Sequence, residues 1–328
     1  MKPKYLKRND TISLVAPSFG CTIYPYDERM KVSIDKLSKD YRIVVGENCK
    51  KSEGIVASNT AKKRADEFMK AYLSDASVIW SVGGGETMVE ILPHIDFKKI
   101  KEAEAKWFVG YSDNTNLTYT LTTFNDLETI YGACFPSFYD QEADEVLRML
   151  LGKKDFAGYQ MYQSLSADSH DLSPIKLDTK KEIKAFNYTK EFNGRLIGGC
   201  LDCLITLCGT RFDKTKEYIE RHKKEGIIFF LEACDLNVIA YRRALFQLKE
   251  SGWFQYIKGF IIGRPLHINE DFFGQNYADT TIDMLKEFNV PILLDCDIGH
   301  LKPTIPLRCG AMATIKLDND NILISYFD

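Results

Sequence analysis

Ser112 lies where an apolar stretch stops and a helical pattern begins. Residues 107–109 are apolar and Gly110 is the next residue. Apolar residues then recur at helical spacing, at Leu117, Leu121 and Phe124. A strand, a sharp turn and a helix in this order can present a serine hydroxyl, with the N–H groups of the helix start facing a developing oxyanion. We therefore expect Ser112 to be a nucleophile. The alternative is that Ser112 or Asp113 only caps the helix.

A carboxylate ends a second apolar stretch. Residues 227–231 are all apolar, and Glu232 is the next residue. A carboxylate at such a strand end must be solvated or paired, because burying an unpaired charge is costly. One suitable partner is an imidazole, whose tautomer the acid would hold. The competing partner is Arg242 or Arg243, in a structural salt bridge.

Among the five histidines, His300 has the setting of a general base. It follows the apolar residues 290–294 and the sequence Asp-Cys-Asp-Ile-Gly, which places it in a loop at a strand end. Asp295 and Asp297 could instead form a metal site with His300, although nothing else nearby completes a ligand set. The role of base is favoured.

Two further motifs are chemically suggestive. The glycines 83–85 follow a strand pattern and could cradle phosphate, supply backbone donors beside Ser112, or form a tight turn. They lack the G-x-G-x-x-G pattern and the spacing of a P-loop, so nucleotide-cofactor binding is weakly supported. Cys200 and Cys203 form a C-x-x-C pair, but no second pair stands at zinc-site spacing, and we expect buried thiols.

The composition is that of an ordinary globular protein. The chain has 328 residues, 45% hydrophobic and 27% charged, with a net charge of −3, so nothing favours a nucleic-acid polymer as partner. No apolar run reaches the length of a signal core or a membrane span, and we expect no membrane partner. Nine irregularly spaced cysteines are most simply free thiols in a reducing cytoplasm.

Strand and helix patterns alternate through the first 150 residues. The strands are expected at 11–16, 41–45, 77–82, 107–110 and 129–133, with helices at 27–37, 60–73, 86–92 and after Ser112. Such alternation predicts a parallel sheet covered on both faces, with ligands beyond the carboxyl ends of its strands. The glycine run and Ser112 both lie at such ends.

Residues 151–193 are polar and lack clear periodicity, so we interpret them as an interdomain connection. This gives an N-terminal α/β domain at 1–150, which carries the nucleophile, and a C-terminal domain at 194–328, which carries Glu232 and His300. In the C-terminal domain we expect strands at 227–232, 259–263, 312–317 and 321–326. We expect three helices there. The first ends near 207, the second runs from a cap at Asp235 to about 250, and the third spans 280–288.

Together these segments resemble one known family. The motifs Gly-Tyr-Ser-Asp at 110–113, Phe-Leu-Glu at 230–232 and Asp-Ile-Gly-His at 297–300 are similar to the three catalytic blocks of the LD-carboxypeptidase serine peptidases. That family includes murein tetrapeptide carboxypeptidases and microcin C self-immunity peptidases. The resemblance extends from about Leu6 to Ile324, and three ordered motifs favour the nucleophile over the cap. Asn114 stands where the G-x-S-x-G motif of α/β-hydrolases has its last glycine.

The resemblance implies an α/β fold in two domains. The N-terminal domain would be a doubly wound parallel sheet like that of class I glutamine amidotransferases, and the C-terminal domain a smaller, β-rich swivelling unit, with the active site in the groove between them. Ser112, Glu232 and His300 would form the triad, and the N–H groups of Asp113 and Gly84, with Gly85 less surely, the oxyanion hole. The family also implies a homodimer and no metal, and we expect no cofactor.

The implied activity is that of a serine carboxypeptidase or amidase acting on a small peptide. Murein-type members carry Arg-Gly-Gly-Tyr-Gly at the glycine loop, whereas this chain has Val-Gly-Gly-Gly-Glu at 82–86, closer to the microcin-immunity branch. We therefore expect a peptidyl-nucleotide or related acyl-amide as substrate. The alternatives are a murein tetrapeptide of cell-wall recycling and a non-catalytic two-domain ligand-binding protein.

Five residues are expected to contact the substrate. Glu86 places a negative charge in the glycine loop, which lacks the arginine that suits a terminal carboxylate; Arg195 or Arg264 could replace that arginine. Phe186 and Tyr188 could stack on a base, a role that the microcin-immunity branch gives to a tryptophan in its connecting loop. Their alternative role is ordinary packing.

Overall fold

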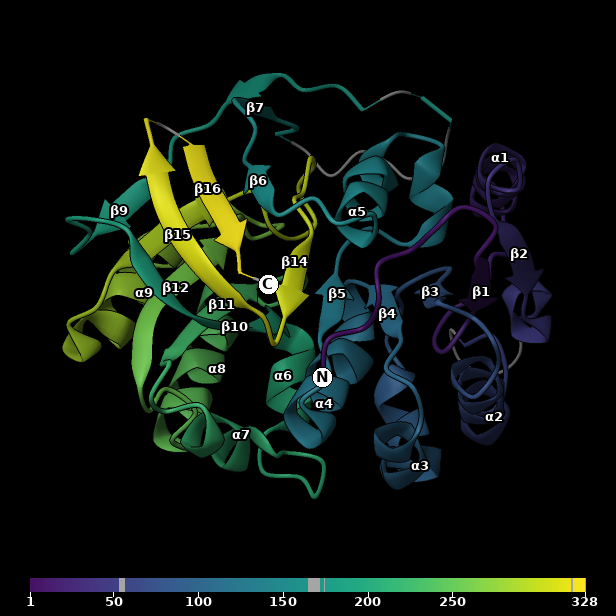
Figure 1. Cartoon of the computed structure of the whole chain (residues 1–328). Helices are drawn as coiled ribbons and strands as arrows, with labels where there is room; N and C mark the ends of the chain where they lie inside the picture. The colour runs from purple at the N-terminus through teal and green to yellow at the C-terminus, as the bar shows by residue number, and fades with distance from the viewer. Residues whose placement is uncertain (53–56, 165–171, 174, 320, 328) are drawn as a thin grey trace. The chain divides into compact units, whose positions relative to one another are not determined.

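The computed structural model describes residues 1–52, 57–164, 172–173, 175–319 and 321–327. The chain forms two compact units. Unit 1 consists of residues 1–153, 168–174 and 306–309, and unit 2 of residues 154–167, 175–305 and 310–328. In Figure 1 the helices of unit 1 run from purple to teal, and the main sheet of unit 2 runs from teal through green to yellow.

Unit 1 contains a six-stranded sheet in the order β14-β5-β4-β3-β1-β2. The parallel strands are β1 (Thr11–Val15), β2 (Arg42–Val45), β3 (Val78–Ser81), β4 (Trp107–Gly110) and β5 (Thr129–Tyr131). Strand β14 (Leu307–Cys309) pairs antiparallel with β5. Every residue of β3, β4 and β5 is buried, which explains their continuous apolar sequences, because a parallel sheet is covered on both faces. The five parallel strands are those predicted from the sequence.

The helices of unit 1 form two packing groups. Helices α1 (Tyr26–Leu37) and α5 (Glu142–Leu150) both contact the 3₁₀ turn η4 (Phe135–Phe138). The second group comprises α2 (Ala61–Tyr72), α3 (Phe97–Glu102), α4 (Thr115–Asn125) and the 3₁₀ helix η2 (Met88–His94). The turns η1 (Glu47–Lys50) and η3 (Ser112–Asn114) precede α2 and α4. The helix predicted at 86–92 is this 3₁₀ helix, whereas α3 and α5 were not predicted.

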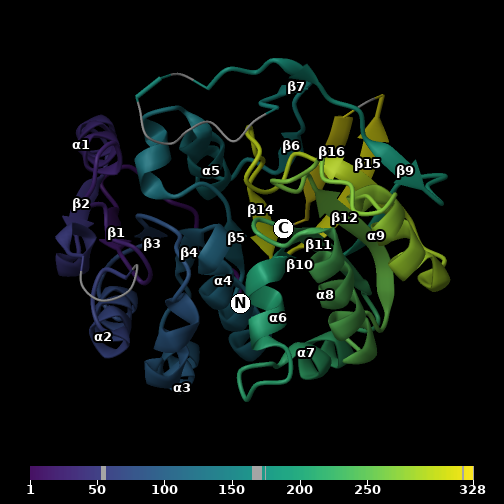
Figure 2. The ribbon, with the colours of Figure 1, turned by 180° about the vertical axis from the view of Figure 1, so that it is seen from behind.

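Unit 2 contains an eight-stranded mixed sheet, in the order β6-β16-β15-β10-β11-β12-β13-β9. Its central strands are parallel: β10 (Phe192–Cys200), β11 (Ile227–Glu232), β12 (Ile257–Gly263) and β13 (Ile292–Cys296). The flanking strands are antiparallel: β15 (Met312–Asp318), β16 (Asn321–Tyr326), β6 (Asp155–Ala157) and β9 (Lys184–Phe186). Figure 2 shows this sheet from behind.

The segment 151–193, predicted as a connection, contributes strands to unit 2. Strands β6 and β9 form the two edges of the large sheet, and β7 (Met161–Tyr162) pairs with β8 (Thr179–Lys180) in a small separate sheet. Residues 165–171 and 174 of this segment lie outside the described residues. Such short strands have too few residues to show a periodic pattern.

The helices of unit 2 follow its strands. They are α6 (Leu201–Leu207), α7 (Thr215–Arg221), α8 (Val238–Glu250) and α9 (Tyr277–Leu285), which continues as the turn η5 (Lys286–Phe288). The cap predicted for α8 was wrong. The Asn237 side chain accepts the N–H of Ala240 and caps the helix, whereas the N–H of Asp235 donates to Asp202.

Candidate active site

The turn that carries Ser112 is strained. Ser112 has φ 61°, in the left-handed region that a residue with a side chain rarely adopts. Its N–H donates to the Tyr131 hydroxyl of the neighbouring strand β5, at 3.1 Å. Helix α4 begins three residues later, so the expected sequence of strand, sharp turn and helix is present.

Asn114 explains why this turn differs from G-x-S-x-G. Its side-chain amide donates to the carbonyl oxygens of Tyr111 and Gly83, at 3.0 Å each. A Cβ on Gly110 would lie 2.5 Å from Asn114 Cγ, so only glycine allows Asn114 to approach. Asn114 therefore links the Ser112 turn to the glycine run.

The glycine run lies directly against Ser112. A Cβ built on Gly84 would lie 3.4 Å from Ser112 Oγ and 3.9 Å from the Asp113 nitrogen. The carbonyl of Gly84 accepts the N–H of Phe19 at 3.1 Å, which fixes the run from its other side. The backbone of Gly84 therefore lies close to the Ser112 side chain and to the Asp113 nitrogen.

In unit 2, Glu232 is hydrogen-bonded to His300. Glu232 is the last residue of β11 and is 1% exposed, and its Oε2 lies 3.0 Å from His300 Nδ1. Gly299 permits this contact, because it has φ 111° and a Cβ there would lie 2.9 Å from the same carboxylate oxygen. Arg242, the competing partner for Glu232, forms an ion pair with Asp283 at 2.6 Å.

The surroundings of His300 favour its charged form. Burial alone would lower the pKa of His300, but the charge of Glu232 and hydrogen bonds with Cys234 and Glu232 outweigh it and raise the pKa well above its usual value. Burial also raises the pKa of the Cys234 thiol, although its hydrogen bond to His300 opposes the shift. An imidazolium formed at this position would therefore be strongly stabilised.

The loop of His300 is held by a buried group of charges. Asp297 is fully buried and pairs with Arg264 Nη1 at 2.6 Å and with Lys181 Nζ at 2.5 Å. Arg264 Nη2 also donates to the carbonyl oxygens of Leu301 and Pro303, on the far side of His300. Arg264 thus braces the loop at both ends. The substrate contact predicted for Arg264 is corrected, because its guanidinium is 1% exposed and committed to this loop.

The other substrate contacts predicted in unit 2 have structural roles. Arg195 pairs with Glu225 at 2.6 Å near the start of β10, whereas Glu232 lies at the end of the neighbouring strand. Phe186 pairs with Ile292, the first residue of β13, at the opposite end of that strand from His300. The Tyr188 hydroxyl accepts the N–H of Leu317, and its ring packs edge-on against Phe192. None of these contacts tests a role in binding, so the roles predicted for these three residues stay predictions. In unit 1, Glu86 is exposed on the glycine loop.

A cavity of about 590 Å³ opens beside the strand end that carries Glu232. The N–H of Leu266, which lines it, donates to the carbonyl of Ala233, next to Glu232. Its described lining includes the carboxylates Asp235 and Glu270. The described residues that line it are Ser164, Asp235, Asn237, Leu266, His267, Ile268, Asn269 and Glu270.

The predicted alternative of a metal site at His300 has no support in the described part of the chain. Asp297 is committed to two cations, and Asp295 lies 3.3 Å from Lys184. No group of three or more His, Cys, Asp or Glu side chains among the described residues is arranged to hold a metal ion. All nine cysteines are free thiols. No helix in the described ranges combines the length and the apolar character needed to cross a membrane.

Comparison with known proteins identifies the family. The model of the LD-carboxypeptidase N-terminal domain matches residues 12–132, and that of the LD-carboxypeptidase C-terminal domain matches residues 193–315. The chain belongs to the LD-carboxypeptidase family. It is therefore a serine-type carboxypeptidase by family, and the resemblance found in the sequence is confirmed.

Relatives of two kinds are similar to this LD-carboxypeptidase. The microcin C7 self-immunity protein of Escherichia coli is 27% identical over 331 residues, covering 96% of this chain and 93% of the relative. A probable murein peptide carboxypeptidase of Bacillus subtilis is 23% identical, covering 96% and 91%. A solved structure of the microcin C7 self-immunity protein in complex with aspartyl sulfamoyl adenosine has a TM-score of 0.83 at 23% identity, covering 99% and 98%, which supports the two-domain α/β fold.

Sequence reasoning missed several residues of this family member that shape the site. Asn114, Tyr131 and Ser18 position the turn of Ser112, and Cys234 contacts His300. Cys234 had a visible signal, since it stands two residues after Glu232, and Asn114 was noticed only as a departure from G-x-S-x-G. Tyr131 and Ser18 act through contacts between distant segments that no local pattern shows.

Proposed function

We propose that this LD-carboxypeptidase hydrolyses an amide bond with Ser112 as nucleophile, His300 as general base and Glu232 as the acid that orients the imidazole. The observation that carries the proposal is the strained Ser112 turn, with φ 61° and Gly84 packed against the hydroxyl. Strain of this kind is maintained only where the surrounding structure enforces it, and it is common at nucleophiles.

The proposed reaction has two stages, acylation of Ser112 and hydrolysis of the acyl-enzyme, and His300 transfers the proton in both. His300 Nε2 accepts the proton of Ser112 Oγ, and Oγ attacks the amide carbonyl carbon. The N–H groups of Asp113 and Gly84, with Gly85 as a weaker candidate, hold the oxyanion. His300 then gives its proton to the leaving amine, and water hydrolyses the acyl-enzyme with His300 again as base. Glu232 is bonded to Nδ1, so Nε2 is the nitrogen proposed to carry out these transfers.

We propose a peptidyl-nucleotide or related acyl-amide as the preferred substrate. Two observations support it. Arg195 and Arg264 are committed to Glu225 and Asp297, and the glycine loop carries the exposed Glu86, so none of these three residues is suited to bind a terminal carboxylate. In addition, a relative of similar fold binds aspartyl sulfamoyl adenosine. The second candidate is a murein tetrapeptide of peptidoglycan recycling, favoured by the Bacillus subtilis relative.

The proposal extends to the setting of the enzyme. We propose that it acts in the cytoplasm and needs no metal or cofactor, and that it is a homodimer, as the family resemblance implies. The nine free thiols agree with a reducing compartment. Sedimentation of the purified full chain would test the dimer.

A serine-directed fluorophosphonate tests the nucleophile. We expect one adduct, located on Ser112 by peptide mass spectrometry, and none on Ser112→Ala. Adduct formation elsewhere would contradict the assignment. The substrate is tested by comparing kcat/KM for a murein LD-tetrapeptide with kcat/KM for a processed peptidyl-adenylate. Efficient cleavage of the tetrapeptide alone would favour the second candidate.

A further inference from the structure

The carboxylate of Asp113 connects three segments that surround Ser112. Its Oδ2 accepts the Ser18 hydroxyl at 2.5 Å and the N–H of Met88 at 2.9 Å. Its Oδ1 accepts the side-chain amide of Asn116 at 2.8 Å. Ser18 follows β1, Met88 follows the glycine run, and Asn116 lies in α4. One side chain therefore joins the loop after β1, the start of η2 and helix α4 at the nucleophile.

Ser18 also contacts the glycine run directly. Gly85 has φ 141°, and a Cβ there would lie 2.4 Å from Ser18 Oγ. The next residue, Phe19, donates its N–H to the carbonyl of Gly84. The Ser18 hydroxyl therefore lies between the glycine run, whose Gly84 is one proposed oxyanion donor, and Asp113, which is the other.

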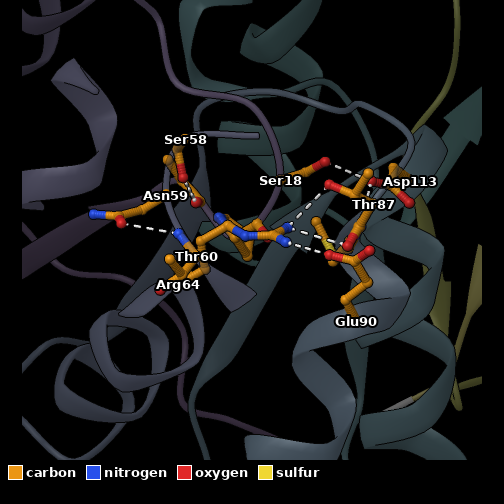
Figure 3. Close-up of polar contacts among 11 residues, drawn as sticks. Ser18, Ser58, Asn59, Thr60, Arg64, Thr87, Glu90 and Asp113 are labelled. Carbon is orange, nitrogen blue, oxygen red and sulfur yellow. Dashed lines mark hydrogen bonds and ion pairs between the residues drawn. The ribbon is translucent and has the colours of Figure 1, made fainter. Parts of the chain in front are cut away.

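Arg64 balances the charge of this group and fixes the other end of the loop. Its Nη1 donates to the carbonyl oxygens of Pro17 and Thr87, and its Nη2 pairs with Glu90 at 3.0 Å. Figure 3 shows the Arg64 guanidinium directed toward Thr87 and Glu90, with Ser18 beside Asp113. The guanidinium is 1% exposed.

The charge of Asp113 does not itself favour the reaction. Burial raises the pKa of Asp113, and hydrogen bonds from Ser18, Met88 and Asn116 oppose the shift, as does the charge of Arg64. A carboxylate beside a developing oxyanion repels it, so a gain in rate has to come from geometry. Accepting three donors from three segments provides such geometry, because each bond restrains one wall of the site.

We infer that Asp113 and Ser18 are positioning residues, which hold the N–H groups of Gly84 and Asp113 at the spacing that an oxyanion requires. The inference rests on the proposed role of Ser112. It predicts that loosening this contact slows acylation of Ser112 more than it weakens substrate binding, because the donors engage fully only in the transition state.

Ser18→Ala is the main test, with Ser58→Ala as matched control. Both serines are fully buried, but the Ser58 hydroxyl donates to the carbonyl of Ala16 and not to Asp113. For Ser18→Ala we expect kcat and the rate of fluorophosphonate labelling at Ser112 to fall about 10- to 100-fold, with KM within about threefold. We expect Ser58→Ala to lower the melting temperature to a similar extent and to keep the wild-type kcat.

A second pair of variants keeps the test decisive if Ser18→Ala does not fold. Asp113→Asn can still accept Ser18 and Met88 through its oxygen. Asn116 can turn its amide so that its Oδ1, which has no hydrogen-bond partner among the described residues, accepts from the new NH₂ group; it then gives up its bond to the Asp113 carbonyl. We therefore expect Asp113→Asn to stay within about tenfold of wild-type kcat and Asp113→Ala to lose about a hundredfold or more.

The outcomes separate this inference from the proposed function. Labelling of wild type anywhere but Ser112 would contradict the proposed function. Wild-type labelling at Ser112 with an unchanged rate in Ser18→Ala would overturn the positioning role alone. Equal losses in Asp113→Asn and Asp113→Ala would also overturn it, because charge and not hydrogen-bond geometry would then be responsible.

Discussion

His300 Nδ1 lies 3.0 Å from Glu232 Oε2, and this carboxylate is completely buried. The contact joins the end of β11 to the loop after β13, with β12 between the two strands. Gly263 at the end of β12 makes this possible, because a Cβ there would lie 2.2 Å from the carbonyl oxygen of Ile298. The loop of His300 therefore crosses the end of β12, and it can come this close only because residue 263 is a glycine.

Glu232→Gln should lower the rate and move its pH dependence. A general base must be neutral, and Glu232 raises the pKa of His300, so kcat/KM of the wild type should rise with pH through a value above the usual histidine range. The glutamine amide carries no charge to stabilise the imidazolium, so the rise of kcat/KM, which we call the acid limb, should move to lower pH. The plateau rate should also fall, because the imidazolium loses its partner. A pH profile of kcat/KM for both proteins measures this; an unmoved limb would argue against the pair.

Ser112→Ala should abolish turnover without loss of stability. The hydroxyl contributes little to folding, and φ 61° strains both serine and alanine. Ser112→Gly should be inactive too, but it should be more stable than Ser112→Ala by about 1 kcal/mol, because glycine adopts this conformation without strain. Urea unfolding of the two inactive variants gives this difference. If Ser112→Gly is the less stable, the turn is not strained.

The sequence predicted the elements around Ser112 because the signals there are local. Strand β4 is apolar throughout, and helix α4 follows at once with its own periodicity. Glu232 was singled out for a similar reason, as an acid at the end of an apolar strand. Where one segment contained both the pattern and the residue, the prediction needed no tertiary information.

The sequence could not predict the roles of Arg264 and Asp235, because their partners are distant in the chain. Arg264 was expected to bind substrate, yet it pairs with Asp297, which also pairs with Lys181, and no spacing in the sequence connects these three segments. Asp235 was predicted to cap the helix that follows it, but in the structure the side chain of Asn237 caps that helix. A charged residue has many possible partners in a sequence, and only the folded strands select one.

Lys181→Met should destabilise unit 2 and impair activity. Lys181 and Asp297 are both buried, and breaking such a pair costs about 3–5 kcal/mol, here toward the lower end because Arg264 still pairs with Asp297. Lys184→Met is the matched control. Lys184 is 61% exposed beside Asp295, and removing such a surface pair costs about 0–1 kcal/mol. Urea unfolding and kcat of both variants measure the contrast; equal losses would refute a bracing role for Lys181.

Chelators should leave activity unchanged. Asp297, the acid nearest to His300 in the motif, is committed to Arg264 and Lys181 and is not available as a ligand. Activity assayed after dialysis against EDTA should equal that of the untreated enzyme. Loss of activity that is restored by zinc or manganese would revive the metal hypothesis.

Glu86→Gln should improve cleavage of substrates that end in a free carboxylate. Glu86 is exposed on the loop whose Gly84 lies against Ser112, so its charge should repel a terminal carboxylate bound near the nucleophile. An exposed charge is screened by solvent, so we expect only a two- to fivefold gain in kcat/KM for a murein LD-tetrapeptide, decreasing as salt is added. The amidated tetrapeptide, which lacks the terminal charge, should show no gain. Glu102→Gln on α3 removes an exposed charge outside the glycine loop and should leave kcat/KM unchanged for both the free and the amidated peptide. A gain that is equal for the free and amidated peptides would show that Glu86 acts on the loop conformation and not on substrate charge.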